Sequence, residues 1–312
     1  MASRGASEVP GQEGRSPLVP LMADSVQPKT VDAGRHATRA STGHVLARSI
    51  SVARGLRVRT VGTRLLGILA PLIVWEFLTR SGVLPREYLP PTSVIIAKMW
   101  DLLGQQAFWS DVGLTLEGWA IGFGISIAVA LPLGLIVGTN AYLYRGCRIF
   151  VEAMRPIPSV ALIPLAVLIF GISTEMKVFL VAFATFWPIF IQSIYGVQDV
   201  DPIARDTARS FGLGRRAIFF RVTLPSAAPY IATGLRLANA LGIILAITAE
   251  LVAGVPGLGR SILLAQSGGT NDLLYALIAA TGLLSFALSA AFSRAERRLL
   301  HWHTNYRAGG KS

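Results

Sequence analysis

The chain has 312 residues, of which 15% are charged and 52% hydrophobic, with a mean hydropathy of +0.54. A soluble globular protein carries about 25% charged residues. The composition therefore excludes an ordinary pair of soluble domains, and it also excludes collagen-like, disulfide-rich and wholly disordered chains. The charges are unbalanced, with 29 Lys and Arg against 17 Asp and Glu, a formal net charge of +12. A chain that is both apolar and basic indicates a membrane protein with positively charged loops.

The first 64 residues differ from the rest of the chain. They contain no aromatic residue, ten Lys or Arg and four acidic residues. Such a segment buries too little apolar surface to fold by itself, so we predict that residues 1–64 form a disordered basic tail. Its last part, residues 44–64, mixes aliphatic side chains with arginines. A segment lying on an anionic membrane surface and an ordinary basic linker both fit this pattern.

Long apolar runs follow the tail. About 20 apolar residues are needed to cross a bilayer as a helix. Candidate spans are found at residues 65–79, 118–144, 156–174, 178–198, 222–249 and 273–293. Only the first and the fifth contain a charge, Glu76 and Arg236 respectively. The sequence therefore predicts an all-α, polytopic membrane domain over residues 65–300 with about six transmembrane helices, followed by a C-terminal tail, 301–312.

The basic residues predict the orientation of these spans. With six spans both termini lie on one side, and 23 of the 29 Lys and Arg lie on that side. The opposite side carries Arg80, Arg86, Lys98, Lys177 and Arg260. The positive-inside rule then places both termini and the loop between the fourth and fifth spans in the cytoplasm, in a multi-pass protein of the cell (inner or plasma) membrane.

The cytoplasmic loop at residues 199–225 contains signals for two short helices. Asp201 followed by Pro202 is a favourable helix start, and Gly212 is suited to end that helix in a left-handed conformation. A second helix is predicted at residues 215–222, with the side chains of Ile218, Phe219 and Val222 exposed on its surface. Pro225 is predicted to end this helix before the next span. Exposed apolar residues on two short helices are typical of a segment that docks in a groove of another protein.

The residues of this loop resemble the coupling motif of the permeases of ABC importers. That motif reads Glu-Ala-Ala, three residues, Gly, nine residues, Ile-x-Leu-Pro. The chain has the same spacing in Asp206, Thr207, Ala208, Gly212, Val222, Leu224 and Pro225. Asp206, Thr207 and Val222 replace the Glu, the first Ala and the Ile. Residues 75–76, 89–92, 155–164 and 257–259 look like the branch that imports aliphatic sulfonates, taurine, nitrate and similar small anions.

The resemblance implies an ABC type I importer permease fold and a multi-subunit complex. Its partners would be a second permease copy, most simply a homodimer, cytoplasmic ABC ATPase subunits, an extracytoplasmic solute-binding protein and membrane lipid. The chain contains no phosphate-binding P-loop motif, so ATP and Mg²⁺ are expected on the partner ATPase, with no cofactor on this chain and no enzymatic activity of its own. The residues expected to contact the ATPase are Asp206, Thr207, Ala208, Gly212, Phe219, Val222, Leu224 and Pro225.

Three residues of the fifth span are candidates for the translocation path. An ionised Arg near a helix centre costs about 2.5–3.5 kcal/mol on insertion scales and needs a partner or water. Arg236 therefore either lines the path of an anion or pairs with Glu76, Glu250 or helix-end carbonyls, and Asn239, one turn away, is expected to share either role. Glu250 is a candidate gate or contact for the binding protein, with a structural hydrogen bond as the alternative.

Other functions fit the sequence less well. A secondary transporter would show internal repeats and more spans, and a membrane enzyme would need a polar catalytic cluster. The four histidines form no set of metal ligands, and the basic tail has no base-reading features for nucleic acid. Within the importer class, a thiamine-precursor-like amine is the alternative to an organosulfonate or related anion.

Overall fold

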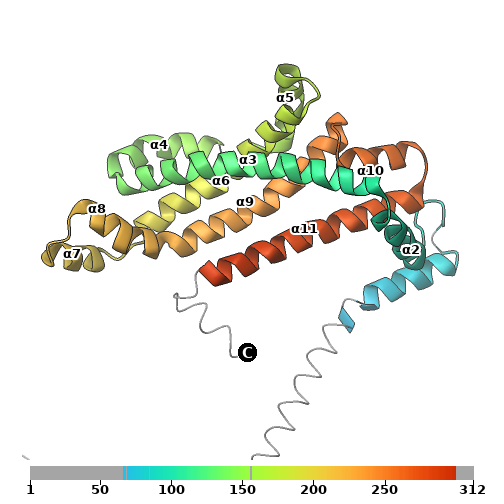
Figure 1. Cartoon of the computed structure of the whole chain (residues 1–312), viewed down its shortest axis with the longest axis horizontal. Coiled ribbons are helices and arrows are strands. Elements are labelled where there is room, and N and C mark those ends of the chain that lie inside the picture. The colour runs from blue at the N-terminus through green and yellow to red at the C-terminus, as the bar shows by residue number, and fades with distance from the viewer. Residues whose placement is uncertain (1–65, 68, 84, 155–156, 300–312) are drawn as a thin grey trace, which may run out of the picture. The chain divides into compact units, whose positions relative to one another are not determined.

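A computed structural model describes residues 66–67, 69–83, 85–154 and 157–299. Helices, turns and bends make up these residues, with no strand among them. The chain divides into two units, Met1–Arg64 and Leu65–Ser312. The predictions for the tails at 1–64 and 301–312 lie outside the described residues. Figure 1 shows how the helices of the second unit follow one another.

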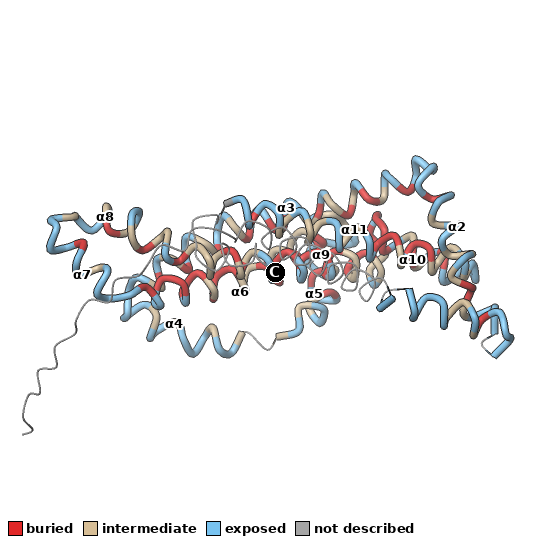
Figure 2. Tube along the Cα trace, turned by 90° about the horizontal axis from the view of Figure 1, so that it is seen from below, coloured by how far each residue is buried: buried red, intermediate tan, exposed pale blue. Residues whose placement is uncertain are grey.

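Three long helices form the centre of this unit. They are α3 (Gln106–Thr139), α6 (Thr174–Gln198) and α9 (Leu224–Ala253). α3 packs along α6, and α6 packs along α9. The α3–α6 contact depends on glycine, because a Cβ on Gly134 would lie 2.7 Å from the carbonyl oxygen of Phe190. Buried residues gather along α6 and α9 (Figure 2).

Other helices form a surface region at each end of α9. α2 (Thr92–Leu103), α10 (Leu258–Ser267) and α11 (Asn271–Leu299) pack together where α9 ends. We call this the α10 end. α7 (Pro202–Ser210) and α8 (Arg215–Ile218) precede the start of α9 and are mainly exposed (Figures 1 and 2). One helix thus joins two surface regions that are far apart along its axis.

The membrane spans agree with the all-α, polytopic prediction. Among the described residues, four helices are long and apolar enough to cross a membrane, at Gln106–Thr139, Thr174–Gln198, Arg215–Ala253 and Asn271–Arg298. The number rises to five if the bent pair Ala141–Met154 and Ser159–Phe170 is one broken span. The predicted first span, 65–79, is helical at residues 66–67 and 69–80 but is not in this set. The count of six stays a prediction.

The predicted third span, 156–174, is not one straight helix. Its described part forms the short helix η1 (Ser159–Leu162) and then α5 (Ile163–Phe170), which Gly171 ends with φ +69°. The two together are about 20 Å long at standard rises, less than the hydrocarbon core of about 30 Å. Their direction differs by 80° from that of the preceding helix α4 (Ala141–Met154). Pro158 and Pro164 begin these short pieces, because proline has no amide hydrogen to continue a preceding helix.

Candidate functional site

The first helix of the 199–225 loop forms where the sequence predicted it. The side chain of Asp201 caps α7 by accepting a hydrogen bond from the amide of Ile203 at 2.8 Å, and Pro202 occupies the first helical position. The cap gives one amide of the first turn a hydrogen-bond partner, and proline fits the first helical position because an amide hydrogen there would have no partner within the helix. Gly212 ends the segment with φ +78°, in the left-handed region. The predicted start and stop signals are therefore confirmed.

Hydrogen bonding explains the spacing between Ala208 and Gly212. The amide of Gly212 donates to the carbonyl of Arg209 at 2.8 Å, and the amide of Leu213 donates to that of Ala208 at 3.2 Å. These two bonds form a Schellman motif. In this motif the residue in the left-handed conformation, here Gly212, lies four positions after the first residue whose carbonyl accepts a bond, here Ala208. The side chain of Ala208 is buried. A small residue and a glycine at this spacing thus fix the turn between α7 and α8.

The second half of the loop corrects the prediction for Pro225. This residue does not end a helix, because α8, the π-helical turn η2 (Phe219–Thr223) and α9 run on as one helix from Arg215 to Ala253. Pro225 lies in the first turn of α9 and has no amide hydrogen. The amide of Leu224 bonds to the carbonyl of Phe219, five residues back. The chain accommodates the proline by widening one turn.

The exposed apolar side chains of the loop differ in part from those expected. Ile218 is only 8% exposed and packs inward, so its predicted exposure is wrong. Phe211 and Phe220 are 81% and 64% exposed, and Ile203 is exposed as well. Phe219, Val222, Leu224 and Pro225 are half-buried, while Asp206 and Thr207 are exposed. The largest exposed apolar side chains of the loop are therefore two phenylalanines, Phe211 and Phe220, which the helix periodicity did not predict to be exposed.

Polar contacts fasten the loop to the central helices. Arg205 donates to the carbonyl of Val197 near the end of α6. The Tyr230 hydroxyl on α9 donates to the carboxylate of Asp199 at 2.7 Å. On the outside of α7, Asp206 and Arg209 form an exposed ion pair at 2.8 Å. Arg205 thus ties α7 to the end of α6, and Asp199 ties the start of the loop to α9.

Arg236 forms an ion pair that the sequence did not predict. Its guanidinium donates to both carboxylate oxygens of Glu296 on α11, from Nε to Oε2 at 3.1 Å and from Nη2 to Oε1. The expected partners Glu76 and Glu250 are both engaged elsewhere. The Arg236 side chain is 48% exposed, whereas that of Glu296 is 3% exposed. Pairing is thus observed, and a role of Arg236 in the path stays a prediction.

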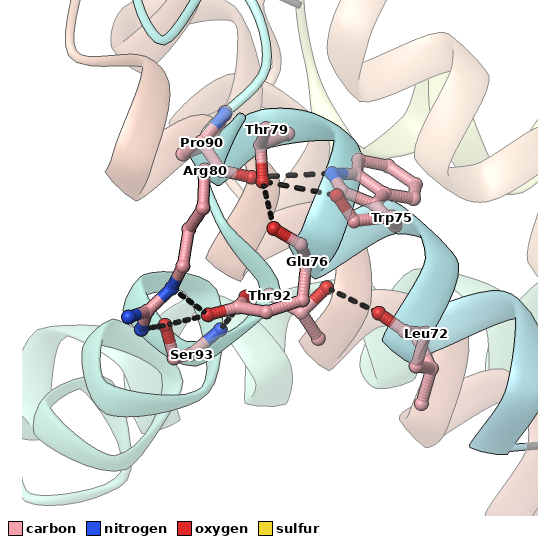
Figure 3. A network of polar contacts seen from close by, with 8 residues as sticks. All are labelled: Leu72, Trp75, Glu76, Thr79, Arg80, Pro90, Thr92 and Ser93. Atoms are coloured by element: carbon pink, nitrogen blue, oxygen red, sulfur yellow. Dashed lines mark hydrogen bonds and ion pairs between the residues drawn. The ribbon is translucent and has the colours of Figure 1, made fainter. Parts of the chain in front are cut away.

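Glu76 has the structural role that a capping carboxylate performs (Figure 3). It accepts hydrogen bonds from the amide and hydroxyl of Ser93 at 3.0 and 2.8 Å, in the first turn of α2. Arg80 donates to the same carboxylate at 2.6 Å. A negative charge at a helix N-terminus is favourable. The helix that contains Glu76 is thereby joined to α2.

Glu250 lies in a buried polar cluster with Lys177. The Lys177 Nζ and the Glu250 Oε1 are 2.8 Å apart, and the two side chains are 1% and 0% exposed. Lys177, which the sequence analysis counted with the basic residues of the outer side, lies in the first turn of α6 and is enclosed by protein. Its side of the membrane stays a prediction. Pairing is physically required here, because an isolated buried charge is costly. The structure therefore favours the structural alternative for Glu250 over direct contact with a partner.

The same cluster holds residues 256–259, which form the end of the connection between α9 and α10 and the first residues of α10. Lys177 donates to the carbonyl of Pro256 at 3.2 Å, and Glu250 Oε2 accepts from the amide of Gly259 at 3.0 Å. The Thr115 hydroxyl donates to Glu250 Oε2 at 2.9 Å and accepts from the amide of Leu258 at 3.0 Å. We refer to Thr115, Lys177, Glu250 and the backbone of 256–259 as the Lys177 cluster. It joins α3, α6, α9 and the start of α10.

Asn239 is buried in α9 between Arg236 and Gly242. Its side chain is 1% exposed, and neither amide atom has a hydrogen-bond partner among the described residues. The Nε1 atom of Trp119, on α3, is also buried without such a partner. The ring of Trp119 lies beside Gly242, one turn from Asn239. Asn239 therefore lies inside the helix bundle, and its role in the path stays a prediction.

Sequence reasoning missed Lys177 and Glu296 for different reasons. Ser173 as N-cap and Glu175 as an acidic residue of the first turn are signals that would have started the helix at Thr174 and so placed Lys177 inside its first turn. No comparable signal exists for Glu296, which lies 60 residues from Arg236 in the sequence. Its partner is selected by the packing of α11 against α9.

The α10 end carries an open, charged cavity of about 750 Å³. Its walls come from residues 86–88, from α2 and from the turn between α10 and α11. The charged side chains in this lining are Arg86, Glu87, Lys98, Asp101 and Asp272. The cavity and the 199–225 loop therefore lie at opposite ends of α9.

Sequence comparison identifies a family and several relatives. The family model for a binding-protein-dependent transport system inner membrane component matches residues 130–301, more than half of the chain. The chain is 29% identical over 244 residues to a taurine transport system permease protein of Escherichia coli, covering 76% of this chain and 89% of that protein. It is 32% identical over 233 residues to a putative aliphatic sulfonates transport permease protein of the same organism, covering 75% and 89%. A nitrate import permease protein of Leptolyngbya laminosa is 27% identical over 206 residues, covering 63% and 74%.

Structure comparison agrees on the fold. A chain of the MetNI methionine ABC transporter, solved in inward facing conformations, matches with a TM-score of 0.54 at 19% identity, covering 62% of this chain and 95% of that chain. Identity at this level supports the fold alone, whereas the family model covers the last part of α3, all of α6 and α9, and the 199–225 loop. The chain belongs to the family of binding-protein-dependent transport system inner membrane components, the permeases of ABC transporters, and is a transport component rather than an enzyme.

Proposed function

We propose that the chain is the permease subunit of an ATP-driven importer for a small organosulfonate or related anion, such as taurine or nitrate. The observation that carries the substrate class is the similarity to permeases for taurine, aliphatic sulfonates and nitrate, at 27 to 32% identity. All three named solutes are small and carry an oxyanion. The half-exposed guanidinium of Arg236 is the intramembrane cation that best suits contact with such a solute.

We propose that the 199–225 loop docks on a separate ATPase that holds ATP and Mg²⁺, and that it transmits the movements of that ATPase to the membrane helices. Phe211 and Phe220 of the loop are exposed, and Asp206 and Arg209 form an exposed ion pair shortly before Phe211 in the sequence. Large aromatic side chains surrounded by charges are typical anchors of protein interfaces. The loop is also fastened to α6 and α9, so that its displacement moves the central helices.

A second copy of the chain is the proposed partner within the membrane. Leu237, Leu241 and Ile244 lie three or four positions apart on α9, and all three are exposed in the single chain. That spacing places them on one helical face. The proposed orientation has both termini and the 199–225 loop in the cytoplasm and the α10 end on the outer side, where a solute-binding protein would contact it.

Co-purification with the ATPase tests the coupling proposal. A charge at Phe211, in the variant Phe211→Asp, is expected to abolish association with the ATPase while leaving the permease in the membrane. Phe170→Asp on α5 is a matched control, because Phe170 is an exposed phenylalanine remote in sequence from the loop. Unchanged co-purification of Phe211→Asp would contradict docking through the loop.

The substrate is tested on the solute-binding protein that works with this permease, to be sought among its neighbouring genes. Its melting temperature is measured with taurine, alkanesulfonates, nitrate and a thiamine-precursor amine. A rise with a sulfonate or nitrate supports the proposal, and ATP-dependent uptake of the same solute by reconstituted vesicles completes it. A rise with the amine alone would contradict the anion assignment.

A further inference from the structure

The Lys177 cluster lies at the junction between the α10 end and the central helices. On one side is a hydrophobic core formed by α2, the start of α3, α10 and α11, which includes Leu102, Phe108, Leu258, Ile262 and Leu277. On the other side is a core of α5, α6 and α9. The cluster is therefore the polar joint between two apolar cores. Hydrogen bonds are directional, so this joint fixes the angle at which α10 leaves α9.

The joint leaves little room for an alternative placement of α10. A Cβ on Gly259 would lie 2.3 Å from the carbonyl oxygen of Ile247, and a Cβ on Gly257 would lie 2.2 Å from the Glu250 carboxylate. Gly257 also has φ +146°, a conformation that L side chains rarely adopt. The segment is thus pressed against α9 as closely as its backbone allows. A displacement of α10 must act on Glu250, and through it on α9.

α9 connects this joint with the 199–225 loop without a break. The helix from Arg215 to Ala253 has 39 residues, which corresponds to about 58 Å at 1.5 Å per residue. Glu250 lies in its last turn, and Phe220 lies in its π-helical turn at the opposite end. A helix packed along most of its length against α6 moves as a rigid element. The same helix therefore senses the position of α10 and carries the proposed ATPase contact.

We propose that Thr115 and Glu250 are positioning residues that fasten α10 to α9, so that a solute-loaded binding protein seated on the α10 end stimulates ATP hydrolysis through α9. This inference rests on the proposed function and adds to it the route by which the outer partner acts. Neither side chain touches the partner, since both are buried. They act through the amides of Leu258 and Gly259 at the start of α10.

The decisive experiment removes one hydroxyl group. Thr115→Val keeps the volume but deletes both the acceptor for Leu258 and the donor to Glu250, whereas Thr115→Ser keeps the hydroxyl. Thr281→Val is the matched control, because Thr281 is a buried threonine on α11 whose hydroxyl has no hydrogen-bond partner among the described residues. Each permease is reconstituted with its ATPase, and ATP hydrolysis is measured alone and with binding protein carrying taurine, or nitrate if taurine does not raise its melting temperature.

We expect Thr115→Val to keep the ATPase bound and the basal hydrolysis unchanged but to lower the stimulation about five- to tenfold, the size of effect that one or two lost hydrogen bonds produce. Thr115→Ser is expected to restore it, and Thr281→Val to leave it unchanged. Glu250→Gln, which keeps an acceptor for Gly259 but loses the charge opposite Lys177, is expected to reduce stimulation as well.

Three results would overturn the inference. They are stimulation of Thr115→Val within twofold of the wild type, an equal loss of basal and stimulated hydrolysis, or failure of both Thr115→Val and Glu250→Gln to assemble with the ATPase. The last two would make the cluster a requirement for folding and nothing more. A wild-type permease that binds no ATPase, or whose hydrolysis no loaded binding protein stimulates, would instead contradict the proposed function itself.

Discussion

Replacing Lys177 by Met tests whether the buried charge of Glu250 is tolerated because the charge of Lys177 neutralises it. Methionine fills most of the volume of the lysine stem, which packs against Gly118, so the change removes mainly the charge. The Glu250 carboxylate is 0% exposed and keeps only its hydrogen bonds from Thr115 and Gly259. Removing one partner of a buried pair costs about 3–5 kcal/mol, because the other charge stays buried and uncompensated.

The second half of this prediction is that a further substitution restores stability. In Lys177→Met/Glu250→Gln a neutral amide replaces the carboxylate and still offers an oxygen to Thr115 and Gly259. We expect the double variant to lose only about 1–3 kcal/mol, the cost of an imperfectly bonded buried amide. The coupling energy between the two sites is therefore expected to be about 2 kcal/mol or more.

The assay is thermal unfolding of the purified full-length protein in detergent micelles. At about 2–4 °C per kcal/mol for a domain of this size, Lys177→Met lowers Tm by about 6–20 °C. Lys98→Met is the control, because the contact of Lys98 among the described residues is an exposed one with Asp101 at 3.8 Å, worth about 0–1 kcal/mol. The reasoning fails if Lys177→Met is as stable as this control, or if the double variant is no more stable than Lys177→Met.

Three further predictions concern other parts of the chain. Arg236→Gln removes the ion pair between the Arg236 guanidinium and the buried carboxylate of Glu296 and is expected to lower stability by about 1–3 kcal/mol, less than the loss of a fully buried pair because Arg236 is half-exposed. If pairing is the main role of Arg236, combining this change with Glu296→Gln restores the normal unfolding temperature, whereas persistent loss of transport in that double variant would assign Arg236 to the path. Gly134→Val brings a side chain against Phe190 and is expected to lower stability by about 1–3 kcal/mol. The control is Gly124→Val, because nothing lies within 4 Å of the Cβ position of Gly124, and equal unfolding temperatures of the two variants would rule out close α3–α6 packing. Gly212→Ala places a side chain at a backbone conformation in the left-handed region, which costs about 1–2 kcal/mol. We expect this variant to co-purify less ATPase at an unchanged amount of permease in the membrane, and undiminished ATPase binding would show that the turn is not needed for docking.

Local features of the fold were predictable because they depend on neighbours in the sequence. Asp201, Pro202 and Gly212 mark α7 through capping and left-handed geometry, which need no distant contact. The apolar runs likewise predicted most of α3, α6, α9 and α11. Two of the corrections have local causes that the hydropathy pattern does not include. Proline widened a helix at Pro225 instead of ending it, and two prolines divided the run at 156–174 into short pieces.

By itself the sequence determined an apolar, all-helical membrane protein and the 199–225 loop, because hydropathy, helix caps and glycine conformations are properties of short segments. Only the tertiary structure decided which charges meet. Lys177 and Glu250 are 73 residues apart and Arg236 and Glu296 are 60 apart, and many other acidic residues were available to each cation. In a low-dielectric interior the partner is the one that helix packing brings within hydrogen-bond distance, and that distance is a property of the assembled helices.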